Sequence, residues 1–221
     1  MQNNVNRGLT KHAMKSLIKS ACVDRLEEFR SYTDELDSTF KGDKQAIVET
    51  FDIPHEEYGI DGKDYDDIME FLSEDVARIE YVFVATFRSS TVVSLYSFLE
   101  KQMHVLCKRL EKTNKFPISV TDLKGDGVVR SKIYLSKMAG ISFDSNGMNG
   151  HWSNIIKLNK VRNQIVHEED FVKRSDDPKN PSQIEKIVIS SNGLSFALGN
   201  QIKVEREYID CSIDTIEAFL T

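Results

Sequence analysis

Residues 92–110 read VVSLYSFLEKQMHVLCKRL, with apolar side chains at the three- and four-residue spacing of an amphipathic helix. The same spacing continues back to Asp64 and on to about Lys112. One helix of that length would span roughly 70 Å, whereas a compact chain of this size has a radius of gyration of about 17 Å. Because hydroxyl and β-branched residues weaken helix propensity across Thr86–Thr91, we expect a break there that produces a long antiparallel helix pair.

The residues before this segment predict an N-terminal helical extension. Apolar residues recur at three- to five-residue intervals from Leu9 to Phe40, which indicates a helix or a broken pair that Gly42-Asp43 ends. The Pro and Gly of Phe51–Gly62 indicate a loop, after which Asp64 can cap the next helix. We therefore expect residues 1–62 to form a helical extension and loop, and residues 63–221 a helical domain continuous with it.

The residues after this segment predict more helices and then a change of character. Val128–Met138 and residues 149–169 are expected to be helices, separated by the turn-rich stretch FDSNGMNG. Ile184–Ile189 alternates partly, as a strand does, and Asn192-Gly193 is a strong hairpin turn.

The tail completes the expected fold. After that turn, Leu194–Leu198 and Gln201–Val204 can return as strands, and Tyr208–Leu220 is amphipathic like a closing helix. The predicted fold class is mainly α, a helical bundle with a long antiparallel helix pair and a small C-terminal β-hairpin before the closing helix.

Charge is distributed unevenly along the chain. The 221 residues carry a net charge of −6, but residues 101–174 contain 14 Lys and Arg against 7 Asp and Glu. Residues 1–100 and 175–221 are both acidic. A basic middle within an acidic protein indicates a local site for an anionic partner rather than general phosphate binding.

Composition argues against several classes of protein. The longest apolar run, Tyr81–Ala85, is far shorter than the roughly 18–20 residues of a membrane helix, and we expect no signal peptide. Cys22, Cys107 and Cys211 lie far apart without metal-ligand spacing. We expect a soluble cytoplasmic protein with no metal site and no cofactor.

The most informative run is LNKVRNQIVHEED, residues 158–170. At 100° per residue, Leu158, Val161 and Ile165 form one core-facing stripe. The opposite face mixes apolar and polar side chains, namely Trp152, Ile156, Asn159, Asn163, Val166 and His167, with Arg162 on its flank. Either the helix is buried on both sides and His167 is an interior histidine, or this face meets a second subunit.

Arg162-Asn163 followed by His167 resembles the R-N-x-x-x-H motif of the HEPN superfamily, near the C-terminal end of an all-helical domain. The stretch 92–110 is similar to the helix that packs beside the motif helix in many prokaryotic HEPN proteins. Ile184–Leu220 resembles the hairpin and closing helix of one subgroup. The resemblance covers about residues 64–220.

The resemblance implies a homodimer joined through the motif helix, with RNA as substrate, no metal and no cofactor. Many HEPN proteins are metal-independent endoribonucleases that act as toxins or as anti-phage, abortive-infection effectors, with an antitoxin or defence-system protein as a possible partner. Cleavage by the RNA 2′-OH needs a base and an acid near neutral pH, and His167 can serve as either. Arg162 can hold phosphate oxygens, and Asn163 can orient His167 or the phosphate.

One position departs from the family pattern. HEPN toxins controlled by a partner nucleotidyltransferase often carry Tyr two residues after the histidine, where this chain has Glu169. Control through nucleotidylation of such a tyrosine is therefore not expected. The acidic run Glu168–Asp170 either raises the pKa of His167 or forms a solvated helix end, and we favour the solvated end.

Further residues could contribute to the same site. Glu100 is either an orienting carboxylate or a helix-face charge, and Trp152 either stacks on a base or packs in the dimer face. A set of cations on the segment 92–115 can guide RNA phosphates or form a solvated face: Lys101, Lys108, Arg109, Lys112 and Lys115.

Three hypotheses follow for the function. The first is a metal-independent HEPN-type endoribonuclease. The second is a catalytically silent HEPN-like dimer that binds nucleotide, RNA or a partner protein. The third is a helical interaction protein in which the motif is a coincidence, so that removing the His167 imidazole would affect stability alone.

Overall fold

The structure is a computed structural model that describes residues 2–51, 62–143 and 148–221. Its elements in chain order are α1 (Gln2–Phe51), α3 (Gly62–Arg78), the π-helical segment η1 (Ile79–Val84), α4 (Ala85–Asn114), η2 (Val120–Asp122), α5 (Gly127–Ala139), α6 (Met148–Glu168), α7 (Gln183–Ser190), β1 (Leu194–Phe196), η3 (Leu198–Asn200), β2 (Ile202–Val204) and α8 (Arg206–Leu220). The predicted fold class is confirmed, because these ranges form a mainly helical bundle with a small antiparallel hairpin before the final helix.

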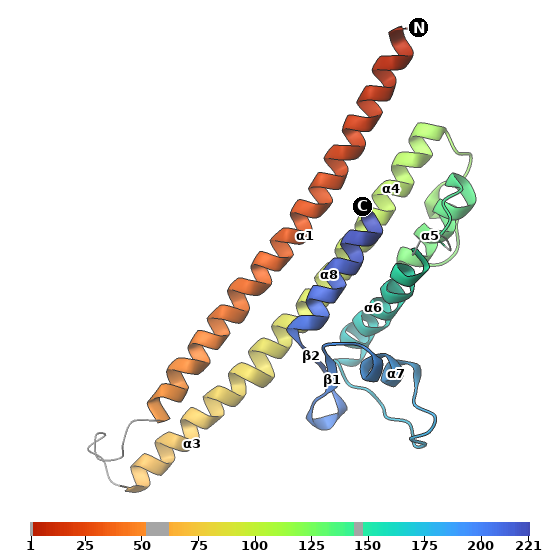
Figure 1. The fold of residues 1–221 in the computed structure, drawn as a ribbon. Helices are drawn as coiled ribbons and strands as arrows, with labels where there is room; N and C mark the ends of the chain where they lie inside the picture. Colours follow the sequence, from red (N-terminus) through yellow and green to blue (C-terminus); the bar gives the residue numbers. More distant parts are fainter. Residues whose placement is uncertain (1, 52–61, 144–147) are drawn as a thin grey trace.

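The long antiparallel pair consists of α1 on one side and of α3, η1 and α4 on the other (Figure 1). The second side is continuous from Gly62 to Asn114, so the predicted break across Thr86–Thr91 is wrong. Within that stretch the Thr91 hydroxyl donates to the backbone oxygen of Phe87 at 3.0 Å, and both residues are buried. Packing and this internal hydrogen bond outweigh weak helix propensity, and the pair extends beyond the bundle as an arm instead of folding back.

Helix α1 continues through Gly42-Asp43, where the sequence predicted its end. Contacts with the neighbouring helix lie on both sides of that point. The ring centroids of Phe40 and Phe87 are 6.0 Å apart, and Lys44 Nζ lies 3.0 Å from a carboxylate oxygen of Glu80. A glycine inside a helix costs about 1 kcal/mol relative to alanine, and these contacts offset that cost.

Two predicted loop regions fall mostly outside the described residues. These are residues 52–61 of the loop Phe51–Gly62 and residues 144–147 of the turn-rich stretch. Helix α3 begins at Gly62, so Asp64 lies in its first turn and not at the cap position. The negative charge of Asp64 there interacts favourably with the positive end of the helix dipole.

The helices that follow α4 agree closely with the prediction. Helix α5 was expected at Val128–Met138 and α6 at residues 149–169, and each differs by one residue at either end. The two helices lie beside α4 (Figure 1). Periodicity was therefore sufficient to locate them.

In the C-terminal part of the chain, one element predicted as a strand is a helix. Residues 184–189 belong to helix α7, not to a strand, because Ser182 and Glu185 form a capping box at its start. The Ser182 backbone N–H donates to Glu185 Oε2 at 2.8 Å, and the Ser182 hydroxyl accepts from the Glu185 backbone N–H at 3.3 Å. IEKIVI fits helical spacing as well as alternation, and the capping box decides between them.

Strands are confirmed within both predicted stretches, Leu194–Leu198 and Gln201–Val204, although each is shorter than predicted. Leu194 pairs with Val204 and Phe196 with Ile202 in antiparallel register. The turn that joins the two strands contains η3. Asn192-Gly193, where the sequence predicted a hairpin turn, instead precedes β1. Gly193 has φ +74°, and a Cβ there would lie 2.4 Å from the backbone nitrogen of Tyr208, so the close approach of the hairpin to α8 requires glycine.

The hydrophobic core surrounds α4. Val92, Leu95 and Leu99 have no exposed surface, and they lie in one buried cluster with side chains from α1, α5, α6 and α8. From α6 the core takes Ile155, Leu158 and Val161, which confirms the predicted core stripe at Leu158 and Val161. The core therefore determines which face of α6 points outward.

The continuous helix Asp64–Asn114 also meets the length and composition criteria for a membrane span, with a window of mean hydropathy 1.3. Of that window, 44% is buried inside the structure. A central core helix of a globular protein meets the same criteria, so this finding is weak evidence for a membrane. It corrects the expectation, based on uninterrupted apolar runs alone, that no segment qualifies.

The end of α6 is anchored to α4 by a buried carboxyl group. Glu169 and Asp170 have φ of 49° and 66°, and Asp170 Oδ2 accepts a hydrogen bond from the Ser89 hydroxyl at 3.0 Å. Its Oδ1 atom is buried and has no hydrogen-bond partner among the described residues. Burial raises the pKa of the Asp170 carboxyl group, although the hydrogen bond from Ser89 opposes this.

Replacing Leu99 with alanine should lower the free energy of unfolding by about 2–5 kcal/mol, because it leaves a cavity in the core. Urea unfolding measures this. Leu198 is 87% exposed, so Leu198→Ala should change the free energy by about 0.5 kcal/mol or less. Equal effects of the two substitutions would contradict the position of the core.

The substitution Asp170→Asn should raise the free energy of unfolding at pH 7. A raised pKa means that the folded state binds the proton more tightly than the unfolded state does. The contribution of this carboxyl group to the free energy of unfolding therefore falls as the pH rises from the ordinary pKa through the raised one. Asparagine keeps an acceptor for Ser89, tolerates a positive φ and carries no charge.

Urea unfolding at pH 7 and near pH 3.5 tests this sign. The gain should shrink at the lower pH, where the aspartate is also protonated. Asp176→Asn, in the exposed loop before α7, is the control and should show no comparable gain. A stability of Asp170→Asn below that of the original chain at pH 7 would refute the expectation.

Candidate active site

The predicted motif lies on the outward face of α6. Arg162 and Asn163 are half-buried, whereas His167 is exposed in the last turn of the helix. His167 makes no hydrogen bond or ion pair with the other described residues. The alternative in which His167 is a satisfied interior histidine is therefore wrong for this chain.

Arg162 is held by two contacts. Its guanidinium carbon lies 5.5 Å from the ring centroid of Tyr96 on α4, and its Nη1 donates to Asn163 Oδ1 at 2.9 Å. Its Nε is buried without a hydrogen-bond partner among the described residues. Asn163 thus orients Arg162, whereas the sequence left open whether it would orient His167 or a phosphate.

Tyr96 was not identified from the sequence, although it lies one helical turn before Glu100 on α4. Burial, and then the negative charge of Glu100, raise the pKa of Tyr96 to about 12. Its hydroxyl is therefore protonated near neutral pH, and it supports Arg162 with a neutral ring. A buried aromatic at this spacing looks like an ordinary core residue in a sequence, so only its contact with Arg162 marks it.

Glu100 lies beside Tyr96 and the start of α5. A Cβ atom placed on Gly127 would lie 3.3 Å from both Glu100 Oε1 and the Tyr96 hydroxyl oxygen. Within the described ranges Glu100 makes no hydrogen bond with Arg162, Asn163 or His167. The carboxylate is thus near Tyr96, whose ring contacts Arg162, and no contact joins Glu100 to the motif residues within the described chain.

The other predicted RNA-binding residues occupy different surroundings. Lys108 Nζ donates to the hydroxyl of Ser119 at 2.7 Å and pairs with Glu111 at 3.3 Å, so it anchors the loop after α4. Arg109 is exposed and lines a cavity beside α1 and the ends of α5 and α8, and Lys112 is exposed near the end of α4.

Trp152 is half-buried within an aromatic cluster. Its ring centroid lies 5.9 Å from that of Phe143 and 6.1 Å from that of Phe219, and Lys132 Nζ lies 4.6 Å from it. These contacts come from α5, α8 and the loop after α5. Trp152 thus packs within this chain at the N-terminal end of α6, whereas His167 lies at the opposite end.

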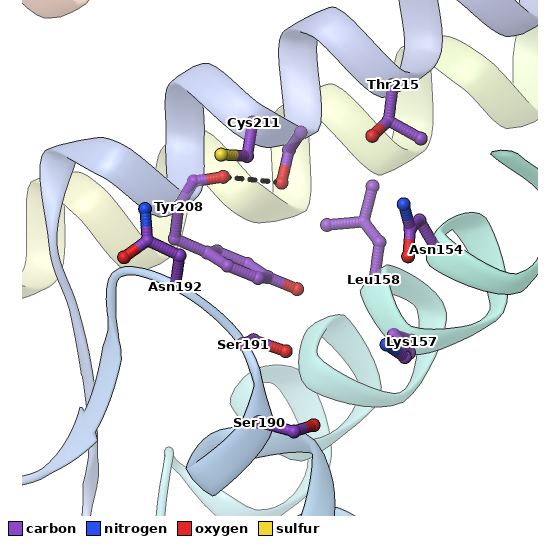
Figure 2. A pocket seen from close by; sticks show the side chains of 10 residues that line it. Asn154, Lys157, Leu158, Ser190, Ser191, Asn192, Tyr208, Cys211 and Thr215 are labelled. Atoms are coloured by element: carbon purple, nitrogen blue, oxygen red, sulfur yellow. Dashed lines mark hydrogen bonds between the residues drawn. The ribbon is translucent and has the colours of Figure 1, made fainter. Parts of the chain in front are cut away.

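A small cavity of about 190 Å³ lies where α6, α7 and α8 meet (Figure 2). Its charged side chain is Lys157, and Tyr208 and the exposed Cys211 line it from α8. The Ser212 hydroxyl donates to the backbone oxygen of Tyr208 at 2.7 Å. Neither a carboxylate nor a histidine lines it, so it offers no acid–base pair.

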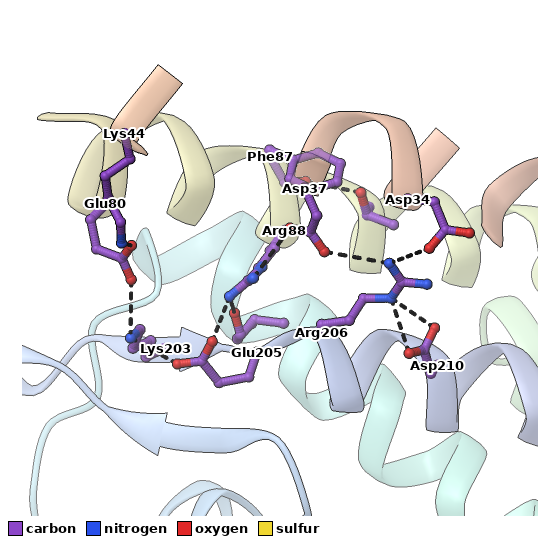
Figure 3. Close-up of polar contacts among 12 residues, drawn as sticks. Asp34, Asp37, Lys44, Glu80, Phe87, Arg88, Lys203, Glu205, Arg206 and Asp210 are labelled. Atoms are coloured by element: carbon purple, nitrogen blue, oxygen red, sulfur yellow. Dashed lines mark hydrogen bonds and ion pairs between the residues drawn. The ribbon is translucent and has the colours of Figure 1, made fainter. Parts of the chain in front are cut away.

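A larger polar cluster joins α1, η1, α4, β2 and α8 (Figure 3). Arg88 binds both Glu205 and Asp37, and Arg206 binds Asp34 at 2.7 Å and Asp210 at 2.9 Å. Each drawn cation has a carboxylate partner, so this cluster is structural: it joins the base of the hairpin to the long helices.

The arrangement at α6 supports acid–base and phosphate-binding chemistry. An exposed imidazole lies about one and a half turns after an arginine whose position is restrained by Tyr96 and Asn163. The guanidinium has N–H donors beyond the one that Asn163 accepts, and these can bind an anionic oxygen. Among the described residues, no three His, Cys, Asp or Glu side chains form a group that could hold a metal ion.

Comparison of this chain with models of known protein families, with curated proteins and with solved structures finds no match.

Proposed function

We propose that this protein is a HEPN-type endoribonuclease that cleaves RNA through attack of a ribose 2′-OH, without a metal ion. The observation that supports this most is the restrained Arg162, which lies against Tyr96 and bonds to Asn163 on the same helix as the exposed His167. A fixed cation and a free imidazole are what this reaction needs.

In the proposed reaction, the 2′ oxygen attacks the adjacent phosphorus while its proton passes to one imidazole. The bond from phosphorus to the 5′ oxygen breaks, and that oxygen receives a proton from a second acid. The products are a 2′,3′-cyclic phosphate and a 5′-hydroxyl end. Arg162 binds the phosphate oxygens on which negative charge develops.

A homodimer would supply the second acid. Val166 is 44% exposed next to His167, and Ile156 is half-buried on the same face of α6. Apolar side chains around a polar motif favour association through this face. His167 of one protomer would then act as base and the partner subunit's His167 as acid.

The biological role follows from the same resemblance. We propose a cytoplasmic toxin or anti-phage, abortive-infection effector, restrained by an antitoxin or another defence-system protein. The alternative is a catalytically silent dimer that binds nucleotide, RNA or a partner. It is favoured by one observation: His167 has no hydrogen-bond partner within the described chain that would orient its imidazole.

Purified protein should cleave mixed RNA in the presence of EDTA and leave 2′,3′-cyclic phosphate ends. His167→Ala should lower the rate about 100-fold or more, because general acid–base catalysis contributes about 10²–10⁴-fold. Arg162→Ala should lower it by a similar factor, because loss of one group that stabilises the transition-state charge costs about 10²–10³-fold. Gel analysis of cleavage measures this.

His151→Ala is the matched control, since His151 is half-buried at the other end of the same helix. It should retain nearly the original rate. Strict dependence on an added metal ion, or equal cleavage by His167→Ala, would refute the mechanism.

Expression of the original chain should arrest cell growth, and Arg162→Ala and His167→Ala should both abolish the arrest. Growth curves with matched expression levels measure this. If the original chain neither arrests growth nor cleaves RNA but is dimeric by light scattering, the silent alternative holds instead.

A further inference from the structure

Two adjoining clefts form a groove across the exposed face of α4. The first, of about 590 Å³, lies between α1 and α4, and the second, of about 290 Å³, lies between α4 and the start of α5. Ser97 and Lys101 line both clefts, so the two adjoin along α4. We call this surface the α1–α5 groove.

The α1 end of the groove is aromatic. Tyr32 is 52% exposed, and its ring meets Phe87 edge-on with centroids 5.6 Å apart. Phe29 and Phe98 pack edge to face at 6.1 Å, and the Arg25 guanidinium lies 4.9 Å from the Phe29 centroid. The exposed tyrosine ring is thus held in place by its neighbours and can stack on a flat, unpaired ring.

The α5 end of the groove is cationic. Lys101 is exposed and Arg130 is partly exposed, and neither forms an ion pair within the described residues. His104 lines the same cleft, together with the carboxylate of Glu100. At the other end Glu28 pairs with Arg25, so the unpaired positive charge is concentrated at Lys101 and Arg130.

The second cleft of the groove reaches residues that surround the Tyr96 hydroxyl. Glu100 and Gly127 line its second cleft, and both lie beside the Tyr96 hydroxyl. The ring of Tyr96 in turn contacts the guanidinium of Arg162. Arg162, Asn163 and His167 line neither cleft, so the groove reaches Arg162 only through the buried Tyr96 side chain.

We infer that the α1–α5 groove binds single-stranded RNA, with a base stacked on Tyr32 and the backbone phosphates at Lys101 and Arg130. Aromatic platforms combined with a positive groove are the usual means of binding single strands. Bases inside a duplex are already stacked and cannot use the tyrosine ring. The choice of RNA over other single strands rests on the proposed function, which the groove deepens by naming the form of substrate.

The experiment measures binding without cleavage. A labelled single-stranded 2′-O-methyl RNA lacks the attacking hydroxyl, so fluorescence anisotropy reports affinity whether or not the protein is a ribonuclease. Tyr32→Leu should weaken binding about 5-fold or more, whereas Tyr32→Phe keeps the ring and should bind as the original chain does. Lys101→Ala should reduce the slope of log affinity against log salt by about 0.7, the value for one single-strand phosphate contact.

Matched controls lie elsewhere on the surface. Tyr81 on η1 is 62% exposed, and Lys179 is exposed in the loop before α7, so Tyr81→Leu and Lys179→Ala should bind normally. A duplex of the same length should bind more weakly and should not respond to Tyr32→Leu. Thermal melts verify that each variant is folded.

Normal RNA binding by both Tyr32→Leu and Lys101→Ala would refute the inference that the groove binds single-stranded RNA. An equal loss of duplex binding in Tyr32→Leu would refute it as well. Cleavage of ordinary RNA separates this inference from the proposed function. Tyr32-dependent binding without any cleavage supports the groove and refutes only the ribonuclease, whereas cleavage with Tyr32-independent binding refutes only the groove.

Discussion

Burial of α4 on several sides is the constraint on which the rest of the structure depends. Val92, Leu95 and Leu99 are fully buried against α1, α5, α6 and α8. Because α6 must turn Ile155 and Val161 toward the same core, its opposite face, with Asn163 and His167, is left pointing outward. Hydrophobic packing thus sets the orientation of a polar motif that contributes little to the core itself.

Polar contacts then fix the ends of the helices that packing alone leaves loose. Arg88, with a side chain only 14% exposed, connects Asp37 on α1 to Glu205 at the start of α8. Ser89, the residue after Arg88 on α4, binds the carboxyl group of Asp170 and so fixes the end of α6. These partly buried carboxylates carry a desolvation cost, and their specific contacts hold the hairpin and the end of α6 in place against α4.

Local patterns were sufficient wherever the deciding interactions are close in sequence. The bounds of α5 and α6 follow from helical periodicity, and the two strands follow from their composition. The errors arose where two patterns were equally compatible or where distant contacts decided. Residues 184–189 fit both alternation and helical spacing, and the continuity of α4 past Thr91 depends on burial against other helices.

By itself, the sequence determined the bounds of α5 and α6 to within one residue, which face of α6 is apolar and that Arg162, Asn163 and His167 share one helix. These are properties of spacing along a single element. Only the tertiary structure decided that Arg162 contacts the Tyr96 ring, that Glu100 lies beside Tyr96 and the start of α5, and that Lys108 anchors the loop after α4. Those contacts join residues on different elements, and the packing angles of the helices around α4 determine which of them meet.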